Sequence, residues 1–167
     1  MNLISKFIEI TQKWPEKDAI VSDSNRSTFS ELNERSNQVA SLISQTSFAK
    51  ENGVIAIHTN DVFHMAITVL GAMKAGQTYM LIDPAWPLQK VKDIFERVDA
   101  KAFFSCVNLS LDMSEMLDLA QIEIIYPEQI EETEQYFSQP DLNEKQPAYV
   151  IATSGTTGQA KLFTQSY

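Results

Sequence analysis

Residues 53–87 have the sequence GVIAIHTNDVFHMAITVLGAMKAGQTYMLIDPAWP, and this stretch decides the expected fold. It begins with a β-branched run over 54–57 that is too short for a helix and apolar at every position, which is typical of a parallel strand covered on both faces. Apolar residues at helical spacing then predict a helix over 61–75, and Gly76 is placed to end it. Residues 79–82 predict the next strand. Strand, helix and strand in this order indicate a βαβ unit.

The rest of the chain extends the same alternation. Further strands are predicted at 102–105, 122–126 and 149–153, a short hairpin at 19–22 and 26–28, and helix starts at Leu3, at Thr28 with its Thr-x-x-Glu capping box, and at Pro87. We therefore expect an α/β fold, with a mostly parallel sheet and helices on both of its faces. The segment 107–147 is less regular, and we expect it to combine one or two exposed helices with an edge strand.

Length and composition limit the class of protein. The chain has 167 residues, enough for one domain or at most two. No apolar run approaches the roughly 18 residues of a membrane helix, and the N-terminus has no signal-peptide pattern, so we expect no membrane contact and a cytoplasmic location. Cys106 is the only cysteine, which excludes a disulfide framework and a cysteine-based zinc site. His58 and His64 are interpreted as core or surface residues and not as metal ligands.

The net charge of −9 is distributed unevenly. Between Lys101 and Lys145 there is no Lys or Arg, and this stretch holds ten acidic residues, whereas the remainder has 13 basic and 12 acidic residues. A protein that binds duplex nucleic acid needs clustered basic residues, so we expect no nucleic-acid partner. The acidic stretch is a solvated face or, alternatively, a docking surface for a basic partner.

The segment 149–161 combines an apolar strand with a loop suited to phosphate. The strand leads directly into hydroxyl side chains, two glycines and a lysine, namely Thr153, Ser154, Gly155, Thr156, Thr157, Gly158 and Lys161. Glycines let backbone N–H groups approach anionic oxygens, while hydroxyls and an ammonium add further donors. The spacing does not fit a Walker A loop, because Ala160 stands where that motif needs its second glycine. The alternative is a Ser/Thr/Gly-rich surface loop with an incidental lysine.

This segment resembles the phosphate-binding signature of the adenylate-forming enzymes, the superfamily of acyl-CoA synthetases, luciferases and peptide-synthetase adenylation domains. Their pattern is Ser/Thr-Ser-Gly-Ser/Thr-Thr-Gly-x-Pro-Lys-Gly, and the seven residues named above match it in register. Ala160 and Leu162 depart from it, at the positions of the usual proline and the usual final glycine. The first departure makes the turn less rigid, and the second restricts the backbone just past Lys161.

Two more segments are similar to the same superfamily. Residues 70–87 resemble the Leu-Lys-Ala-Gly…Ile-Asp-Pro-x-x-Pro element of amino-acid-activating domains, and 28–37 resemble their Thr-Tyr-x-Glu-Leu-Asn-x-x-Ala-Asn helix start. The three elements occur in the family's order and at about its spacing. The resemblance spans nearly the whole chain and favours the peptide-synthetase type.

The resemblance implies that residues 1–167 are the N-terminal portion of an adenylation domain, ending just after the phosphate loop. The complete enzyme would use ATP and Mg²⁺ to activate a carboxylate, most readily an amino acid, as an acyl-adenylate, and would then pass the acyl group to a carrier-protein or CoA thiol. In that scheme residues 153–158 hold the β- and γ-phosphates, and Lys161 offsets charge as pyrophosphate leaves. The remaining walls of the site, the magnesium-binding acid and the catalytic lysine all lie downstream, so no catalytic and no metal-binding residue is assigned here.

Two hypotheses follow from the sequence. The first is an enzyme fragment that is inactive alone. The second is a stand-alone interaction or regulatory domain with an adenylation-like fold, which docks through its acidic segment. The coding sequence after Tyr167 would distinguish them.

Overall fold

The computed structural model describes residues 3–22, 26–49, 51, 53–126, 130, 146–153 and 161–166. Its elements in chain order are α1 (Leu3–Lys13), β1 (Asp18–Val21), β2 (Arg26–Thr28), α2 (Phe29–Gln45), β3 (Val54–His58), α3 (Val62–Lys74), β4 (Thr78–Ile82), α4 (Leu88–Phe95), β5 (Ala100–Ser105), α5 (Leu111–Leu119), β6 (Glu123–Ile125), β7 (Pro147–Thr153) and β8 (Lys161–Ser166). Strands and helices alternate from β3 to β6, as the sequence from Gly53 onward predicts.

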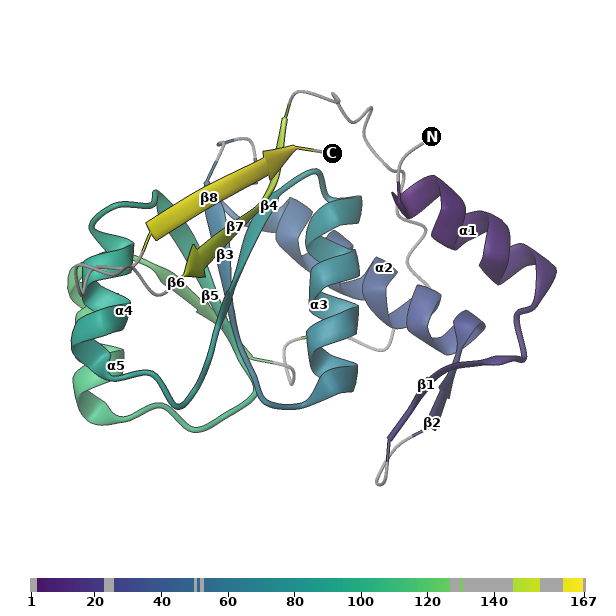
Figure 1. The fold of residues 1–167 in the computed structure, drawn as a ribbon, viewed down its shortest axis with the longest axis horizontal. Coiled ribbons are helices and arrows are strands. Elements are labelled where there is room, and N and C mark those ends of the chain that lie inside the picture. The colour runs from purple at the N-terminus through teal and green to yellow at the C-terminus, as the bar shows by residue number, and fades with distance from the viewer. Residues whose placement is uncertain are drawn as a thin grey trace.

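A six-stranded sheet with the order β6-β5-β3-β4-β7-β8 forms the centre of the molecule. Its strands are parallel except β8, which runs antiparallel to β7 at one edge. Helices α2 and α3 lie on one side of the sheet and α4 and α5 on the other (Figure 1). The expected α/β class, with helices on both faces of a mostly parallel sheet, is confirmed. A separate antiparallel hairpin, β1-β2, lies below α1 and α2, also as predicted.

Each face of the sheet has its own hydrophobic core. On one face, Ile55, Ile57 and Phe104 pack against α2 and α3. On the other, Ala56, Met80, Ile82, Phe103 and Val150 pack with residues of α4 and α5. The fully apolar run of β3 is explained by this arrangement, because successive side chains of one strand enter the two cores in turn.

Local signals begin and end the helices where the sequence predicts. The capping box of α2 is present: Glu31 N donates to Thr28 Oγ1 at 3.2 Å, and Thr28 N donates to Glu31 Oε2 at 2.8 Å. Gly76 follows α3 with a positive φ of 69°, a conformation that glycine adopts without strain. Pro87 caps α4, which ends at Phe95.

Three features differ from the sequence-based expectation. The final strand β8 was not predicted, because residues 161–166 are mostly exposed and lack an apolar alternation. The first part of the acidic segment forms α5 and the edge strand β6, but α5 is not simply exposed, since Met113 and Leu117 are buried. Cys106 has no histidine or cationic neighbour in sequence and is expected to be a buried small hydrophobic residue, but it is only half-buried. Residues 127–129 and 131–145 of the 107–147 segment lie outside the described residues.

Candidate nucleotide-binding site

The candidate site lies at the carboxyl edge of the sheet, where β7 ends. Thr153 is the last residue of β7 and Lys161 the first of β8, and the two are register partners. The Thr153 Oγ1 donates to the Lys161 carbonyl oxygen at 3.5 Å. The fold thus brings together the first and last predicted site residues at the base of one loop, with both side chains exposed. The other predicted site residues, Ser154, Gly155, Thr156, Thr157 and Gly158, lie outside the described residues.

An open pocket of about 530 Å³ lies beside this edge. It is lined by residues at the carboxyl ends of β3, β4 and β7 and by Met65 of α3, and its surface is mainly apolar. In open α/β sheets, ligands bind outside the carboxyl ends of the strands. The pocket also includes Asp83, whose Oδ1 accepts a hydrogen bond from Ala85 N at 2.8 Å. An aspartate directly before a proline is expected to form a turn and not to act as an acid catalyst, and this contact confirms that expectation for Asp83.

His58 ends β3 close to this edge, yet its contacts are structural. Its Nδ1 lies 3.0 Å from Ser105 Oγ, and the Ser105 hydroxyl donates to the Val107 carbonyl at 2.9 Å. Because the serine proton is already committed to that carbonyl, the imidazole Nδ1 is the donor of this pair and does not activate the serine. Burial lowers the pKa of His58, against an opposing effect of the Asp83 carboxylate. The interpretation of His58 as a core residue is confirmed.

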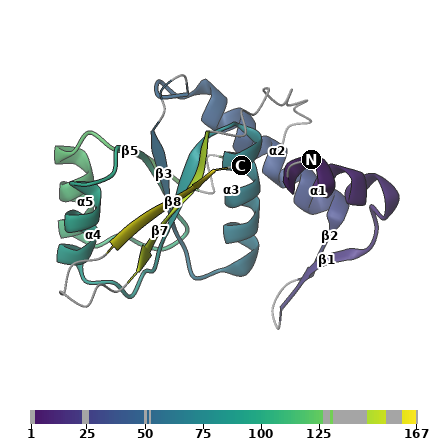
Figure 2. The same ribbon diagram turned by 45° about the horizontal axis from the view of Figure 1, so that its top comes forward.

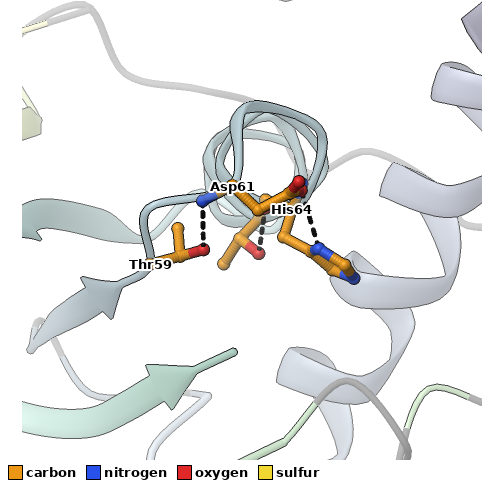
Figure 3. A network of polar contacts seen from close by, with 4 residues as sticks. Thr59, Asp61 and His64 are labelled. Carbon is orange, nitrogen blue, oxygen red and sulfur yellow. Dashed lines mark hydrogen bonds and ion pairs between the residues drawn. The ribbon is translucent and has the colours of Figure 1, made fainter. Parts of the chain in front are cut away.

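His64 and Asp61 form the start of α3, shown in Figure 3. The Asp61 Oδ1 accepts from the His64 backbone N at 2.7 Å and lies 2.8 Å from His64 Nδ1. The Asp61 backbone N donates in turn to Thr59 Oγ1 at 3.1 Å. The backbone N–H of His64, more than its ring, holds the pKa of Asp61 below its usual value. This is an N-cap, and no cluster of three or more His, Cys, Asp or Glu residues in a metal-binding arrangement occurs in the described part of the chain.

One polar residue of consequence escaped the sequence interpretation: Lys74, the last residue of α3. Its side chain is only 2% exposed. The ammonium donates to Asn33 Oδ1 at 2.8 Å, to Ser36 Oγ at 2.7 Å and to Asn37 Oδ1 at 2.7 Å, and it also lies 3.1 Å from Asn33 O. It lies 5.4 Å from the centroid of the Phe7 ring. Burial lowers the pKa of Lys74 to about 7.

Lys74 connects the two other segments that resemble the superfamily, since its three side-chain acceptors lie within residues 28–37 of α2. Gly71, one turn earlier, lets the two helices approach: a Cβ on Gly71 would lie 2.4 Å from Val39 Cγ1. Gly71 and Lys74 therefore join α3 to α2, whereas the end of the same motif segment, from Leu81 to Trp86, contributes to the pocket. The available sequence signal was the position of Lys74 on the buried stripe of α3, seven residues after Ile67.

Comparison with known proteins supports the family resemblance on which these motifs were identified. Residues 7–166 match the family model described as AMP-binding enzyme. The chain is 29% identical over 157 residues to tyrocidine synthase 2 of Brevibacillus parabrevis, covering 93% of this chain and 4% of that protein. It is 33% identical over 149 residues to the nonribosomal peptide synthetase gliP of Aspergillus fumigatus, covering 87% of this chain and 7% of that protein. The chain therefore spans a small part of the curated relatives it matches.

Solved structures share the fold. The N-terminal subdomain of Klebsiella oxytoca NpsA superposes with a TM-score of 0.78 at 18% identity, over 97% of this chain and 39% of that one. A complex of VinN with L-aspartate gives a TM-score of 0.80 at 14% identity, over 98% of this chain and 43% of that one. In both, the matched fold is less than half of the solved chain.

Within the residues that the structure describes, no helix is long and apolar enough to cross a membrane.

Proposed function

The chain belongs to the AMP-binding enzyme family, and from this premise we propose that it supplies the phosphate-binding part of an ATP-dependent ligase that activates a carboxylate as an adenylate. One observation supports the site assignment above all. Thr153 and Lys161, the two ends of the signature, are paired at the carboxyl edge of the sheet and flank the hydroxyl- and glycine-rich residues 154–160 in the sequence. Such edges are where nucleotide ligands bind in open α/β sheets.

The donor chemistry of residues 153–161 fits a polyphosphate. The segment offers hydroxyls, backbone N–H groups of two glycines and one ammonium, and it contains no carboxylate. In our proposal Thr153, Ser154, Gly155, Thr156, Thr157 and Gly158 bind the β- and γ-phosphate oxygens, and Lys161 places a positive charge where pyrophosphate departs. ATP supplies the activated α-phosphate. The family resemblance places the magnesium-binding acid in the downstream sequence, and residues 153–161 contain no carboxylate that could take its place.

The substrate we propose is an amino acid or a related carboxylate. The support is the similarity to peptide synthetases over nearly the whole chain. We propose a carrier-protein or CoA thiol as the acceptor of the activated acyl group and the cytoplasm as the compartment. The side chains that select the carboxylate would lie in the downstream portion.

The test is carboxylate-dependent exchange of pyrophosphate into ATP by the complete enzyme that contains residues 1–167. Removing one charge-stabilising donor typically lowers turnover by about 100- to 1000-fold, and we expect that loss for Lys161→Ala. Lys6→Ala is the matched control, because Lys6 is an exposed lysine of α1 that forms a surface ion pair with Glu9. Exchange by Lys161→Ala at the parental rate, with the fold intact by circular dichroism, would refute the assignment of the loop.

Residues 1–167 alone should not support this exchange. A few charge-assisted hydrogen bonds of roughly 1.5–3 kcal/mol each must offset an association cost of about 4–15 kcal/mol, which leaves millimolar affinity for ATP at best. Isothermal titration of ATP into the isolated chain measures this directly. Micromolar binding would contradict the proposal that the other walls of the site come from downstream sequence.

A further inference from the structure

Strand β8 has one side chain that enters a hydrophobic core. The strand pairs with β7 along one edge, and no other strand of the described residues lies on its far side. Five of its six side chains are exposed, and only that of Leu162 is partly buried. Leu162 packs with Ala152 against the core that includes Val150 and residues of α4 and α5. Among the described side chains of β8, Leu162 is therefore the one that anchors the strand.

The register of β7 and β8 makes room for Leu162 next to Lys161. Leu162 lies opposite Ala152, and the next pair along the strands is Lys161 with Thr153. The small side chain of Ala152 leaves space on this face of the sheet for the leucine. Figures 1 and 2 both show β8 beginning beside α4 and running away from it. The anchored end of the strand is thus the end that carries Lys161.

Burial of Leu162 sets the direction of the Lys161 side chain. Side chains alternate along a strand, so Lys161 lies on the face opposite to Leu162, and there it is exposed. The carbonyl oxygen of Lys161 accepts a long hydrogen bond from Thr153 Oγ1 at 3.5 Å. A rotation of β8 about its own axis would turn the lysine away from this face and would expose the leucine to water.

The two departures from the family signature lie on either side of Lys161. Where the signature has Pro-Lys-Gly, this chain has Ala160, Lys161 and Leu162. A proline restricts the backbone before the lysine, and a glycine leaves the backbone after it free. This chain has the reverse arrangement, with a less restricted residue before the lysine and an anchored residue after it. Leu162 lies in an extended strand, and Gln121 is the only non-glycine residue with a positive φ among those described, so the backbone at 162 does not need glycine.

We propose that Leu162 is a positioning residue for Lys161: its contact with the core holds the start of β8 and thereby directs the ammonium toward the departing pyrophosphate. The proposal rests on the function proposed above for Lys161, and it adds an anchor that the family signature does not contain. A misplacement of about 1 Å in a site can lower a rate on the order of 100-fold, so the backbone that carries a charge-stabilising lysine must be held in place. Leu162 takes over the restraint that the proline of the signature would provide.

The test is pyrophosphate exchange by the complete enzyme that contains residues 1–167, with kcat and KM measured separately. Leu162→Gly should lower kcat about tenfold and leave the KM for the carboxylate unchanged, because the ammonium is misplaced while the carboxylate site is intact. Leu162→Met, which keeps an apolar side chain of similar volume, should retain the parental kcat. Thr164→Gly is the matched control, because Thr164 is an exposed residue of β8 that lies on the same face as Leu162.

Two double variants separate positioning from a general loss of structure. Ala160→Pro combined with Leu162→Gly restores the signature, and it should recover the parental kcat because the proline again restrains the lysine. Lys161→Ala combined with Leu162→Gly should be no slower than Lys161→Ala alone, because Leu162 acts only through the lysine. A merely structural effect of Leu162 would instead add to the loss caused by Lys161→Ala.

Three outcomes would overturn the proposal: a parental kcat in Leu162→Gly, an equal loss in Thr164→Gly, or a further loss when Leu162→Gly is added to Lys161→Ala. If Leu162→Gly loses its circular dichroism spectrum, Leu162→Ala shortens the side chain without freeing the backbone and takes its place with the same expected loss. The two proposals fail separately. A parental rate in Lys161→Ala would refute the function of the loop, whereas a loss in Lys161→Ala without one in Leu162→Gly would refute only the positioning.

Discussion

The contact between α2 and α3 and the end of the β7-β8 pair each contain a lysine from a segment that resembles the family, yet the two lysines have opposite surroundings. Lys74 is 2% exposed and bound to three side-chain oxygens of α2, whereas Lys161 is exposed beside the candidate phosphate loop. The difference assigns Lys74 a structural role, whereas the chemical role of Lys161 is what we propose. The two residues are both lysines, so the burial of the side chain, and not the residue type, distinguishes the structural lysine from the proposed chemical one.

The largest effect on stability is expected from Lys74→Ala. The substitution leaves the oxygens of Asn33, Ser36 and Asn37 without their donor and opens a cavity, which together should cost about 3 kcal/mol in the free energy of unfolding. Lys161→Ala, at an exposed strand end, should change it by less than about 0.5 kcal/mol. Urea unfolding followed by circular dichroism measures both. Equal losses in the two variants would remove the distinction between a structural and a chemical lysine.

A smaller loss is expected from Gly71→Ala at the same helix contact. Intrinsic helix propensity predicts a gain of about 1 kcal/mol for this exchange. The new Cβ would lie 2.4 Å from Val39 Cγ1, so overpacking should reverse the sign and destabilise the protein by about 2 kcal/mol. Adding Val39→Ala should recover part of this loss in a double-mutant cycle. A stabilised Gly71→Ala variant would show that the helices separate without cost.

The smallest effect is the pH dependence contributed by Lys74. Its pKa of about 7 in the fold lies below the value of about 10.4 for an unfolded chain. Between these two pH values the unfolded chain binds more protons, so the stability contributed by this lysine rises as pH increases. The side-chain oxygens around the ammonium favour its charged form and oppose the effect of burial.

We therefore expect the parent to gain about 1 kcal/mol over Lys74→Met between pH 7 and pH 8, from urea unfolding at each pH. Lys6→Met, on the exposed side of α1, serves as the control and should follow the parent across this range. Parallel curves for the parent and Lys74→Met would mean that Lys74 stays charged in the fold throughout.

Much of the fold could be predicted because its signals are local. The apolar run of β3, the capping box at Thr28 and the glycine after α3 each act within a few residues, and the structure confirms all three. Strand β8 could not be predicted in this way. Its residues 161–166 pair with β7 along one edge while most of their side chains stay exposed, so no hydrophobic pattern marks the strand.

The candidate site was predicted only in part, for a related reason. The signature residues from Thr153 to Lys161 are consecutive, and the kinds of donor they offer are visible in the sequence. The pocket beside them combines the ends of three strands with a residue of α3, and its members are separated by many residues along the chain. No local pattern could bring Met65 beside Leu81 and Ile151.

The amino-acid sequence by itself determined the alternation of strands and helices, the helix caps and the donor chemistry of the terminal loop, because each depends on neighbours within one or two turns of the chain. Tertiary structure alone decided that Lys74 is buried among oxygens of another helix and that the ends of β3, β4 and β7 line one pocket with Met65 of α3. Both outcomes depend on which distant segments pack together, and solvent exposure is a property of that packing.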